Sequence, residues 1–415
     1  MMPNGWERTS FGLLAEFRNG LNFTKADRGE AIKIVGVADF KDHSSLSSLD
    51  NLGVISVSNT VKDNDLIKSG DVLYVRSNGN KDLIGRCLFF PEVTEKLSFS
   101  GFTIRGRVTS KAILPNYLAL LSRSEIVKQQ FLKNGGGTNI SNLSQQILND
   151  VVVPLPAIEE QRKIAKILST WDKAIATTEK LIETSKQQKK ALMQQLLTGK
   201  KRLVNPETGR AFEGEWERYS MSELVFIDRK SLGKKTPDDF EFQYISLSDV
   251  DVGSISKELE VHKFASAPSR ARRVIQVGDI LLSTVRPNLK GFAKVTDKYA
   301  DKIASTGFSV LTPKSQVSCD YIYQYIFSAH ITGQIDSLVV GSNYPAINSS
   351  DVSGLKVYCP ELEEQTKIAS VLTATDKEIE VLEAKLAHFK QEKKALMQQL
   401  LTGKRRVKVD DAETV

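Results

Sequence analysis

The chain has 415 residues, which is too long for one compact core and fits two domains with connecting elements. Its apolar content of 40% and charged content of 26% are typical of a soluble globular protein, and no apolar run approaches the about 18 residues that a membrane span needs. The net charge of +7 favours a polyanionic partner, but weakly. Three unclustered cysteines and the absence of a signal-peptide pattern favour a cytoplasmic protein with reduced thiols over a disulfide frame or a metal site.

The first 155 residues alternate short apolar stretches with polar turns, which predicts a mixed α/β domain. Gly135–Gly137 interrupts this pattern, a polar loop follows at 139–143, and the apolar Val151–Val153 leads into a long helix. The predicted strands cover residues 32–37, 53–57, 71–75, 86–90 and 102–108, and a helix is predicted over 115–133.

Residues 156–202 carry apolar positions at seven-residue spacing over four to five heptads, which predicts a coiled-coil helix. Pro156 stands at its start and Gly199 near its end, as is usual for helix termini. An ordinary pair of amphipathic helices in two separate cores is the alternative. One seam contains Ile164, Trp171, Thr178, Ser185 and Leu192, and the other contains Leu168, Ile175, Ile182, Lys189 and Leu196.

The rest of the chain repeats this order. A Pro-, Gly- and charge-rich linker at 203–215 precedes a second mixed domain at 216–359, a second coiled-coil helix at 360–406 and a tail at 407–415. The seams of the second helix contain Ile368, Thr375, Leu382, Phe389 and Leu396, and Leu372, Ile379, Leu386, Lys393 and Leu400.

The two halves are copies of one unit. The sequence KKALMQQLLTGK at Lys189–Lys200 recurs unchanged at Lys393–Lys404, and the segments 156–202 and 360–406 share 27 of 47 residues without a gap. The order globule, helix, globule, helix predicts that the two helices pair antiparallel, with pseudo-two-fold symmetry and one globule at each end. The expected class is therefore α+β. Duplex DNA shares this symmetry, so each globule would lie on one half-site.

No catalytic constellation is recognisable: glycine-rich nucleotide loops and an amino-methyltransferase tetrad are missing, and the four histidines are scattered. Loops rich in Arg, Lys and Asn are suited to DNA bases and phosphates, although such loops are also ordinary solvated surface. The first candidates follow a Gly-Asp strand in each half, at equivalent places: Arg76, Asn78, Asn80 and Lys81, and Arg286, Asn288 and Lys290. Arg270, Arg272 and Arg273 form a candidate phosphate cluster, and Lys133, Asn139, Asn142, Asn343 and Tyr344 are further candidates.

The chain resembles the specificity (S) subunit of type I restriction–modification systems over nearly its whole length. The resemblance rests on Pro154-Leu155-Pro156 and Glu159-Glu160-Gln161, echoed by Pro360 and Glu363-Glu364-Gln365, and on the helix-ending Leu-Met-Gln-Gln-Leu-Leu-Thr-Gly. The second copy departs slightly, with Tyr358-Cys359 before its proline.

This resemblance implies two target-recognition domains, each reading half of a split DNA site, and helices that set the spacer and dock two methylation (M) subunits. The M subunits would carry S-adenosylmethionine and the adenine-methylating site. Restriction (R) subunits would add ATP- and Mg-dependent translocation and cleavage, and this chain itself would hold no cofactor. Two other interpretations stay open: a coiled-coil scaffold that binds proteins instead of DNA, and a self-sufficient DNA enzyme.

Overall fold

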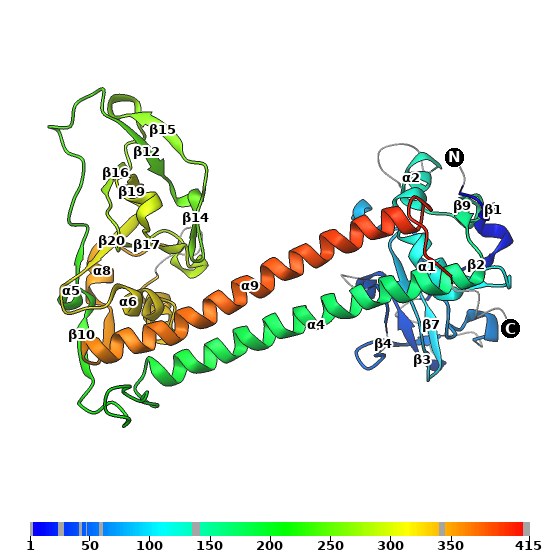
Figure 1. Cartoon of the computed structure of the whole chain (residues 1–415), viewed down its shortest axis with the longest axis horizontal. Helices are drawn as coiled ribbons and strands as arrows, with labels where there is room; N and C mark the ends of the chain where they lie inside the picture. Colours follow the sequence, from blue (N-terminus) through cyan, green and yellow to red (C-terminus); the bar gives the residue numbers. More distant parts are fainter. Residues whose placement is uncertain are drawn as a thin grey trace. The chain divides into compact units, whose positions relative to one another are not determined.

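The computed structural model describes residues 3–23, 29–40, 44–46, 48–57, 61–134, 142–339 and 345–409. The chain divides into two units, residues 1–178 with 385–415 (unit 1) and residues 179–384 (unit 2). Two long helices, α4 (Ile158–Leu196) and α9 (Leu362–Leu400), each contribute to both units (Figure 1). Each unit therefore holds one globular part and a segment of each long helix.

The globular part of unit 1 is built on a four-stranded antiparallel sheet of order β2-β8-β5-β6. Its strand β5 (Val72–Val75) is buried at every residue, because both faces of the sheet are covered. Val72 and Tyr74 join the core made with the helices, whereas Leu73 and Val75 join a second core under the β4-β3-β7 sheet. The other elements are β2 (Ala15–Asn19), β8 (Thr103–Val108), β6 (Cys87–Phe89), β4 (Gly53–Val57), β3 (Glu30–Val35), β7 (Leu97–Phe99), α1 (Pro115–Ser122), α2 (Glu125–Asn134) and α3 (Gln145–Asn149).

Helix α4 is anchored to this globule at its first turns. Strand β9 (Val152–Leu155) pairs antiparallel with β1 (Glu7–Ser10) and leads directly into the helix. The fully buried Gln161 then donates from Nε2 to the carbonyls of Ala112 (2.8 Å) and Pro156 (2.9 Å), while its Oε1 accepts from the backbone N–H of Leu114 (3.0 Å). These bonds fix the direction in which the helix leaves the domain.

Unit 2 repeats the design with the sheet β11-β20-β17-β18 and a second sheet β15-β12-β19-β16. Gln365 repeats the role of Gln161, since it accepts from Ser318 N–H (2.9 Å) and donates to Pro360 O (2.8 Å). The strands are β10 (Glu217–Ser220), β11 (Val225–Ile227), β12 (Glu241–Ile245), β13 (Val250–Asp251), β14 (Ser254–Ile255), β15 (Glu260–Lys263), β16 (Ala271–Val274), β17 (Ile280–Ser283), β18 (Phe292–Lys294), β19 (Ile303–Ser305), β20 (Phe308–Pro313) and β21 (Lys356–Cys359). The helices are α5 (Met221–Leu224), α6 (Cys319–Ile326), α7 (Ala329–Leu338) and α8 (Ser349–Gly354).

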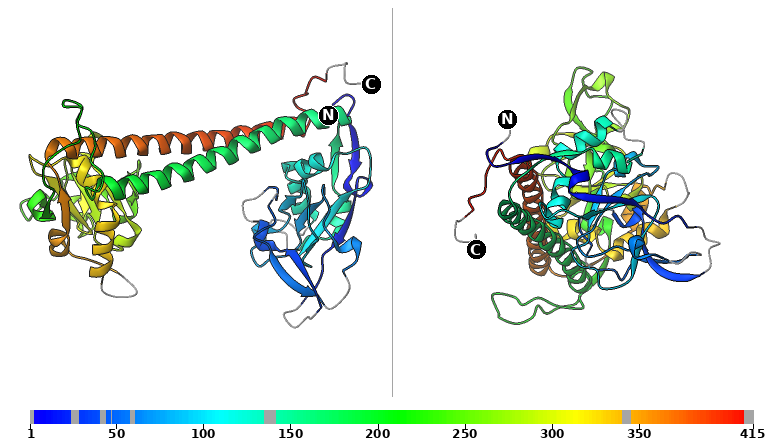
Figure 2. Two further views of the ribbon diagram at one scale, coloured as in Figure 1. Left: turned by 90° about the horizontal axis from the view of Figure 1, so that it is seen from below. Right: turned by 90° about the vertical axis from the view of Figure 1, so that its right-hand side faces the viewer.

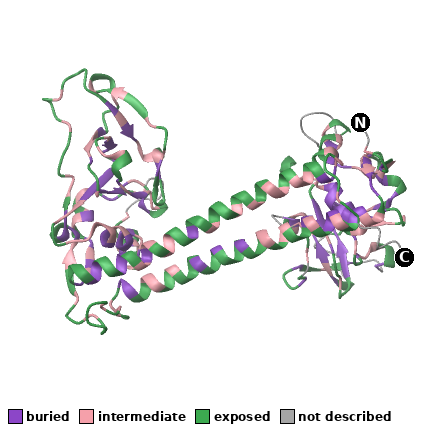
Figure 3. Cartoon of the chain, viewed as in Figure 1, coloured by how far each residue is buried: buried purple, intermediate pink, exposed green. Residues whose placement is uncertain are grey.

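The positions of the predicted heptad seams are covered in the structure. Every seam residue of both helices is buried or half-buried, whereas the off-seam Leu181 and Val381 are 48% and 66% exposed. The views in Figure 2 show α4 and α9 side by side, and Figure 3 shows buried and half-buried positions recurring along both. The helices therefore pair along the predicted seams.

The pairing is antiparallel in each unit. In unit 1 the rings of Trp171 and Phe389 meet edge-on at 5.6 Å. Unit 2 has an ion pair between Lys186 and Glu383 (2.7 Å). Later α4 residues meet earlier α9 residues throughout, and the two lysines in the seams reach acids on the partner helix: Lys393 with Asp172, and Lys189 with Asp376 (2.5 Å).

Two expectations for the first domain were wrong. The helix predicted over 115–133 is two helices, because the chain turns at Arg123 and Ser124 Oγ accepts from Val127 N–H (3.4 Å) at the start of α2. Four strands were also missed: β1, β2, β7 and β9. Their apolar runs are short, and what defines them is pairing with distant strands, which a local pattern does not reveal.

Candidate nucleic-acid interface

Four segments of unit 1 meet at the end of β5, where the first candidate loop begins. Arg76 N–H donates to Phe102 O (2.8 Å), and Leu143 N–H donates to Arg76 O (2.8 Å). Gly101 N–H donates to Leu21 O (2.7 Å). A side chain at Gly101 would collide with Asn22, whose Oδ1 lies 2.0 Å from the Cβ position. These contacts together bring the segments of Asn22, Phe102 and Asn142 to one end of the sheet with Arg76.

The loop after Arg76 is held by its own asparagines. Asn78 Oδ1 accepts from Asn80 N–H (2.8 Å), and Asn80 Oδ1 accepts from Asp82 N–H (3.0 Å) at the start of the 3₁₀ helix Lys81–Leu83. Arg76 is half-buried and its Nη1 donates to Gly101 O at 3.4 Å. The asparagines therefore have a structural role that does not require DNA, and base contacts by these residues stay a prediction.

Two further candidates of unit 1 are exposed. Lys133 is exposed at the end of α2, and Asn142 is exposed just before Leu143. Asn139 lies outside the described residues.

The structure corrects the matching of the two halves. Thr284, and not Arg286, occupies the place of Arg76: its N–H donates to Gly307 O (2.9 Å), and Ile347 N–H donates to its carbonyl (2.9 Å). Arg286 lies two residues further on, in a loop that bears no residue-by-residue relation to the first one. The two halves therefore present different chemistry at equivalent sheet ends.

The loop of unit 2 has an unusual backbone. Arg286 and Lys290 have φ values of 48° and 54°, in the left-handed region that side chains other than Gly seldom adopt. Between them Pro287 is buried, while Asn288 and Leu289 are exposed. Arg286 is exposed and Lys290 is half-buried, and Asn343 and Tyr344 lie outside the described residues.

The predicted arginine cluster is divided by its environment. Arg270 is exposed, and its carbonyl accepts from Thr306 N–H (2.8 Å). Arg272 stacks on the ring of Phe264 at 4.6 Å. Arg273 forms an ion pair with Asp228 (2.7 Å), so part of its charge is already used inside the domain. Arg270 is the most exposed of the three, and a phosphate contact by it stays a prediction.

Electrostatics also differ between equivalent positions of the two sheets. The buried Asp71 receives two bonds from Arg107, at 2.8 and 2.6 Å. Its counterpart Asp279 is equally buried, but its carboxylate accepts from Thr312 Oγ1 (2.7 Å) and the backbone N–H of Gln276 (2.9 Å). Burial raises the pKa of Asp279 even though these hydrogen bonds oppose it.

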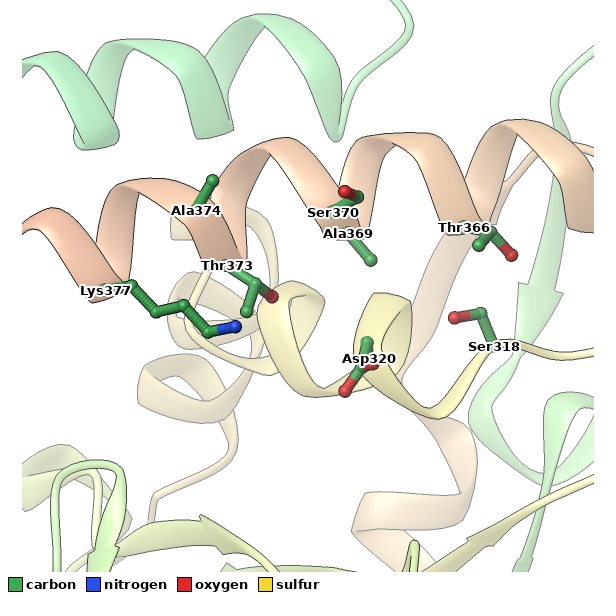
Figure 4. A pocket seen from close by; sticks show the side chains of 8 residues that line it. All are labelled: Ser318, Asp320, Thr366, Ala369, Ser370, Thr373, Ala374 and Lys377. Carbon is green, nitrogen blue, oxygen red and sulfur yellow. The ribbon is translucent and has the colours of Figure 1, made fainter.

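A groove of about 330 Å³ lies between α6 and α9 (Figure 4). The positions one repeat earlier differ in charge: Arg162 stands for Thr366, and Lys166 for Ser370. A partner that binds both halves in the same way would not find the same groove twice. The groove is lined by Ser318, Asp320, Thr366, Ala369, Ser370, Thr373, Ala374 and Lys377.

None of the helices in the described ranges is both long and apolar enough to cross a membrane. Within the same ranges, no three His, Cys, Asp or Glu side chains are grouped as a metal ion would require. Cys87, Cys319 and Cys359 are free thiols, and burial raises the pKa of Cys319 to about 11 and that of Cys359 to about 12.

The chain belongs to the family described as the type I restriction modification DNA specificity domain, which matches residues 3–187 and 214–391. The two matches correspond to the two repeats. A specificity subunit is a non-catalytic component of a type I restriction–modification system, and it determines DNA specificity.

Relatives of this kind are similar along much of the chain. The putative type I restriction enzyme MjaX specificity subunit of Methanocaldococcus jannaschii is 27% identical over 98% of this chain and 95% of its own. The MjaVIII specificity subunit of the same organism is 29% identical over 68% of this chain and 69% of its own. Among solved structures, the S subunit from M. genitalium shares the fold with a TM-score of 0.57 at 12% identity, covering 97% of this chain and 98% of that one.

Proposed function

We propose that each globular part reads one half of an asymmetric, bipartite DNA site, and that the paired helices set the spacer between the halves. The observation that carries this proposal is one framework with two different reading ends. Arg76 and Thr284 occupy the same place at the ends of β5 and β17, and the loops that follow differ in length and backbone. Two unlike half-sites would require different side chains at equivalent positions of the two globular parts.

The helices are proposed to dock two methylation subunits, one on each repeat. Two identical partners need two identical surfaces, and exposed residues that match between repeats are therefore the candidates. Most of them lie toward the C-terminal end of each helix, whereas positions 180, 181, 183 and 184 differ from their counterparts 384, 385, 387 and 388. The matching helix residues exposed in both copies are Lys173, Glu179, Lys186, Gln187, Lys190, Ala191, Gln194 and Gln195, and Lys377, Glu383, Lys390, Gln391, Lys394, Ala395, Gln398 and Gln399.

The division of labour follows from this arrangement. The methylation subunits would bring S-adenosylmethionine and the adenine-methylating site, and restriction subunits would bring ATP- and Mg-dependent translocation and cleavage. This chain would supply recognition: arginine and lysine side chains for phosphates and guanine, and asparagine amides for adenine. Arg76, Arg270 and Arg286 are the first candidates.

Reconstitution tests the proposal. The purified chain alone should neither bind S-adenosylmethionine in calorimetry nor methylate DNA. The complex with the methylation subunits should bind the cofactor, methylate DNA, and bind a defined site selected from random duplexes. Cofactor binding by the isolated chain would instead indicate a self-sufficient enzyme. A reconstituted complex that bound no duplex at any salt concentration would favour a protein-binding scaffold.

A further inference from the structure

One aromatic side chain stands exposed at the reading end of unit 1. Phe102 is 64% exposed, although it lies in a turn whose backbone is firmly held. Its carbonyl accepts from Arg76 N–H (2.8 Å), its N–H donates to Ser100 Oγ (3.3 Å), and the next residue, Thr103, donates from N–H to Ser100 O (2.9 Å). The turn thus fixes the backbone from which the exposed ring projects, so that no backbone ordering is needed when the ring meets a ligand.

Unit 2 presents an apolar side chain at the same end of its own sheet. Leu289 is 62% exposed at the tip of the loop that follows Thr284. Its N–H donates to Arg286 O (2.9 Å), and Arg286 N–H in turn donates to Pro345 O (2.8 Å). The left-handed residues on either side of the 3₁₀ turn Pro287–Leu289 are uncommon conformations, and such local strain tends to occur at functional sites.

Both apolar groups belong to turns whose segments also carry hydrogen-bonding side chains. Asn22, Arg76 and Asn142 belong to the segments that meet at Phe102, and Arg286 and Asn288 precede Leu289 in its loop. In the major groove the polar atoms of the bases suit these neighbours, and the one apolar feature of the base edges is the C5-methyl group of thymine. An apolar side chain on a held backbone, beside side chains that can donate to base edges, is complementary to that methyl group.

We propose that Phe102 and Leu289 are specificity-determining residues, each of which contacts the C5-methyl group of a thymine in its own half-site. This inference rests on the proposed function, because it assumes that the two sheet ends face DNA. It adds residues that the sequence pattern did not indicate: Phe102 was expected inside a strand, where an apolar residue is ordinary, and Leu289 stood within a loop whose polar residues were the candidates.

The test uses the complete complex with its methylation subunits and the DNA site found by methylation mapping. Each thymine of the site is replaced in turn by deoxyuridine, which removes only the methyl group, and the dissociation constant is measured. For the wild-type complex, one replacement in each half-site should weaken binding about three- to tenfold. Phe102→Ala should abolish the effect of the replacement in one half-site only, and Leu289→Ala that in the other.

Two control variants make the result specific. Phe102→Leu keeps an apolar contact and should retain part of the thymine preference. Leu13→Ala removes a side chain that is 72% exposed and precedes the first residue of β2, at the end of the strand away from Phe102. It should leave the response to deoxyuridine unchanged. If the wild-type complex selects its site but Phe102→Ala and Leu289→Ala keep the full response to deoxyuridine, or weaken target and unrelated DNA equally, the inference is wrong. If the wild-type complex selects no site, the proposed function itself fails.

Discussion

Glu160 and Arg406 lie 246 residues apart in the chain and form a two-point ion pair within unit 1, with Nε–Oε1 at 2.8 Å and Nη2–Oε2 at 2.9 Å. Trp6 Nε1 donates to the same carboxylate at 3.0 Å, and Glu160 is only 3% exposed. The Glu160 carboxylate raises the pKa of Arg406. Unit 2 repeats the pair with Glu364 and Arg202, at 2.7 Å for both contacts. The segment after each long helix is therefore tied to the start of the other one.

Replacing the buried carboxylate tests this tie. Glu160→Gln should lower the free energy of unfolding by about 2–3 kcal/mol, because it leaves Arg406 and Trp6 with a weaker acceptor. The matched control is Glu159→Gln, whose partner Arg162 lies one turn away on the same exposed helix face and which should cost well under about 1 kcal/mol. Urea unfolding measures both. Equal effects of the two variants would mean that the ion pair does not stabilise the unit.

The long helices were predictable because a seven-residue period of apolar residues can be recognised within one stretch of sequence, and the same residues then form the contacts between the paired helices. Pairing of the seams at Trp171 and Phe389 follows directly from it. The Glu160 contacts were not predictable, since they join chain segments 154 and 246 residues apart. The predicted equivalence of Arg76 and Arg286 was wrong for another reason. An arginine follows each Gly-Asp strand, but the extra residues before Arg286 shift it away from the place of Arg76. The hydrogen bonds at the strand ends reveal this shift.

The two equivalent buried aspartates should respond oppositely to neutralisation. The pKa of the Asp279 carboxyl is raised in the folded protein, so its ionised form destabilises the fold. This loss of stability is complete above the folded-state pKa and is absent below the pKa of the same carboxyl in the unfolded chain, about 4. Asp279→Asn should therefore stabilise the protein at pH 8, with a gain that shrinks as the pH falls. Asp71→Asn should instead destabilise it by about 2–3 kcal/mol at pH 8, since Arg107 loses its partner.

Unfolding curves of both variants from pH 4 to pH 8 check this contrast. An effect of Asp279→Asn that is the same from pH 4 to pH 8 would show that the pKa of this carboxyl does not differ between the folded and the unfolded protein, and would contradict the argument.

The proposed docking surfaces predict a change of stoichiometry. Ala191→Arg or Ala395→Arg places a large side chain on the matching exposed face of one repeat, and should reduce the number of bound methylation subunits from two toward one. Leu181→Lys is the matched control, because Lys385 already stands at that position in the second repeat. Native mass spectrometry gives the count. Two bound subunits with either arginine variant would place the docking surface elsewhere.

Helix length should set the spacer. One heptad inserted after Thr178 and another after Leu382 keep both seams and the antiparallel pairing, and add about 10 Å of helix at 1.5 Å per residue. Duplex DNA rises about 3.4 Å per base pair, so the spacer should widen by up to about three base pairs while both half-sites stay the same. The methylated motif of the lengthened protein reports this. Activity at the old spacing alone, or an altered half-site, would show that the helices do not measure the DNA.

The most direct test of the two-reader account is long-read mapping of methylated adenines in cells that contain the methylation subunits, with and without this chain. The account predicts that one motif depends on the chain, and that it consists of two unlike half-sites separated by a spacer of fixed length. Arg76→Ala should relax one half-site and Arg286→Ala the other, with about 1–3 kcal/mol of discrimination lost at each contacted base. A chain-dependent motif that is continuous, or the same methylation pattern without the chain, would contradict it.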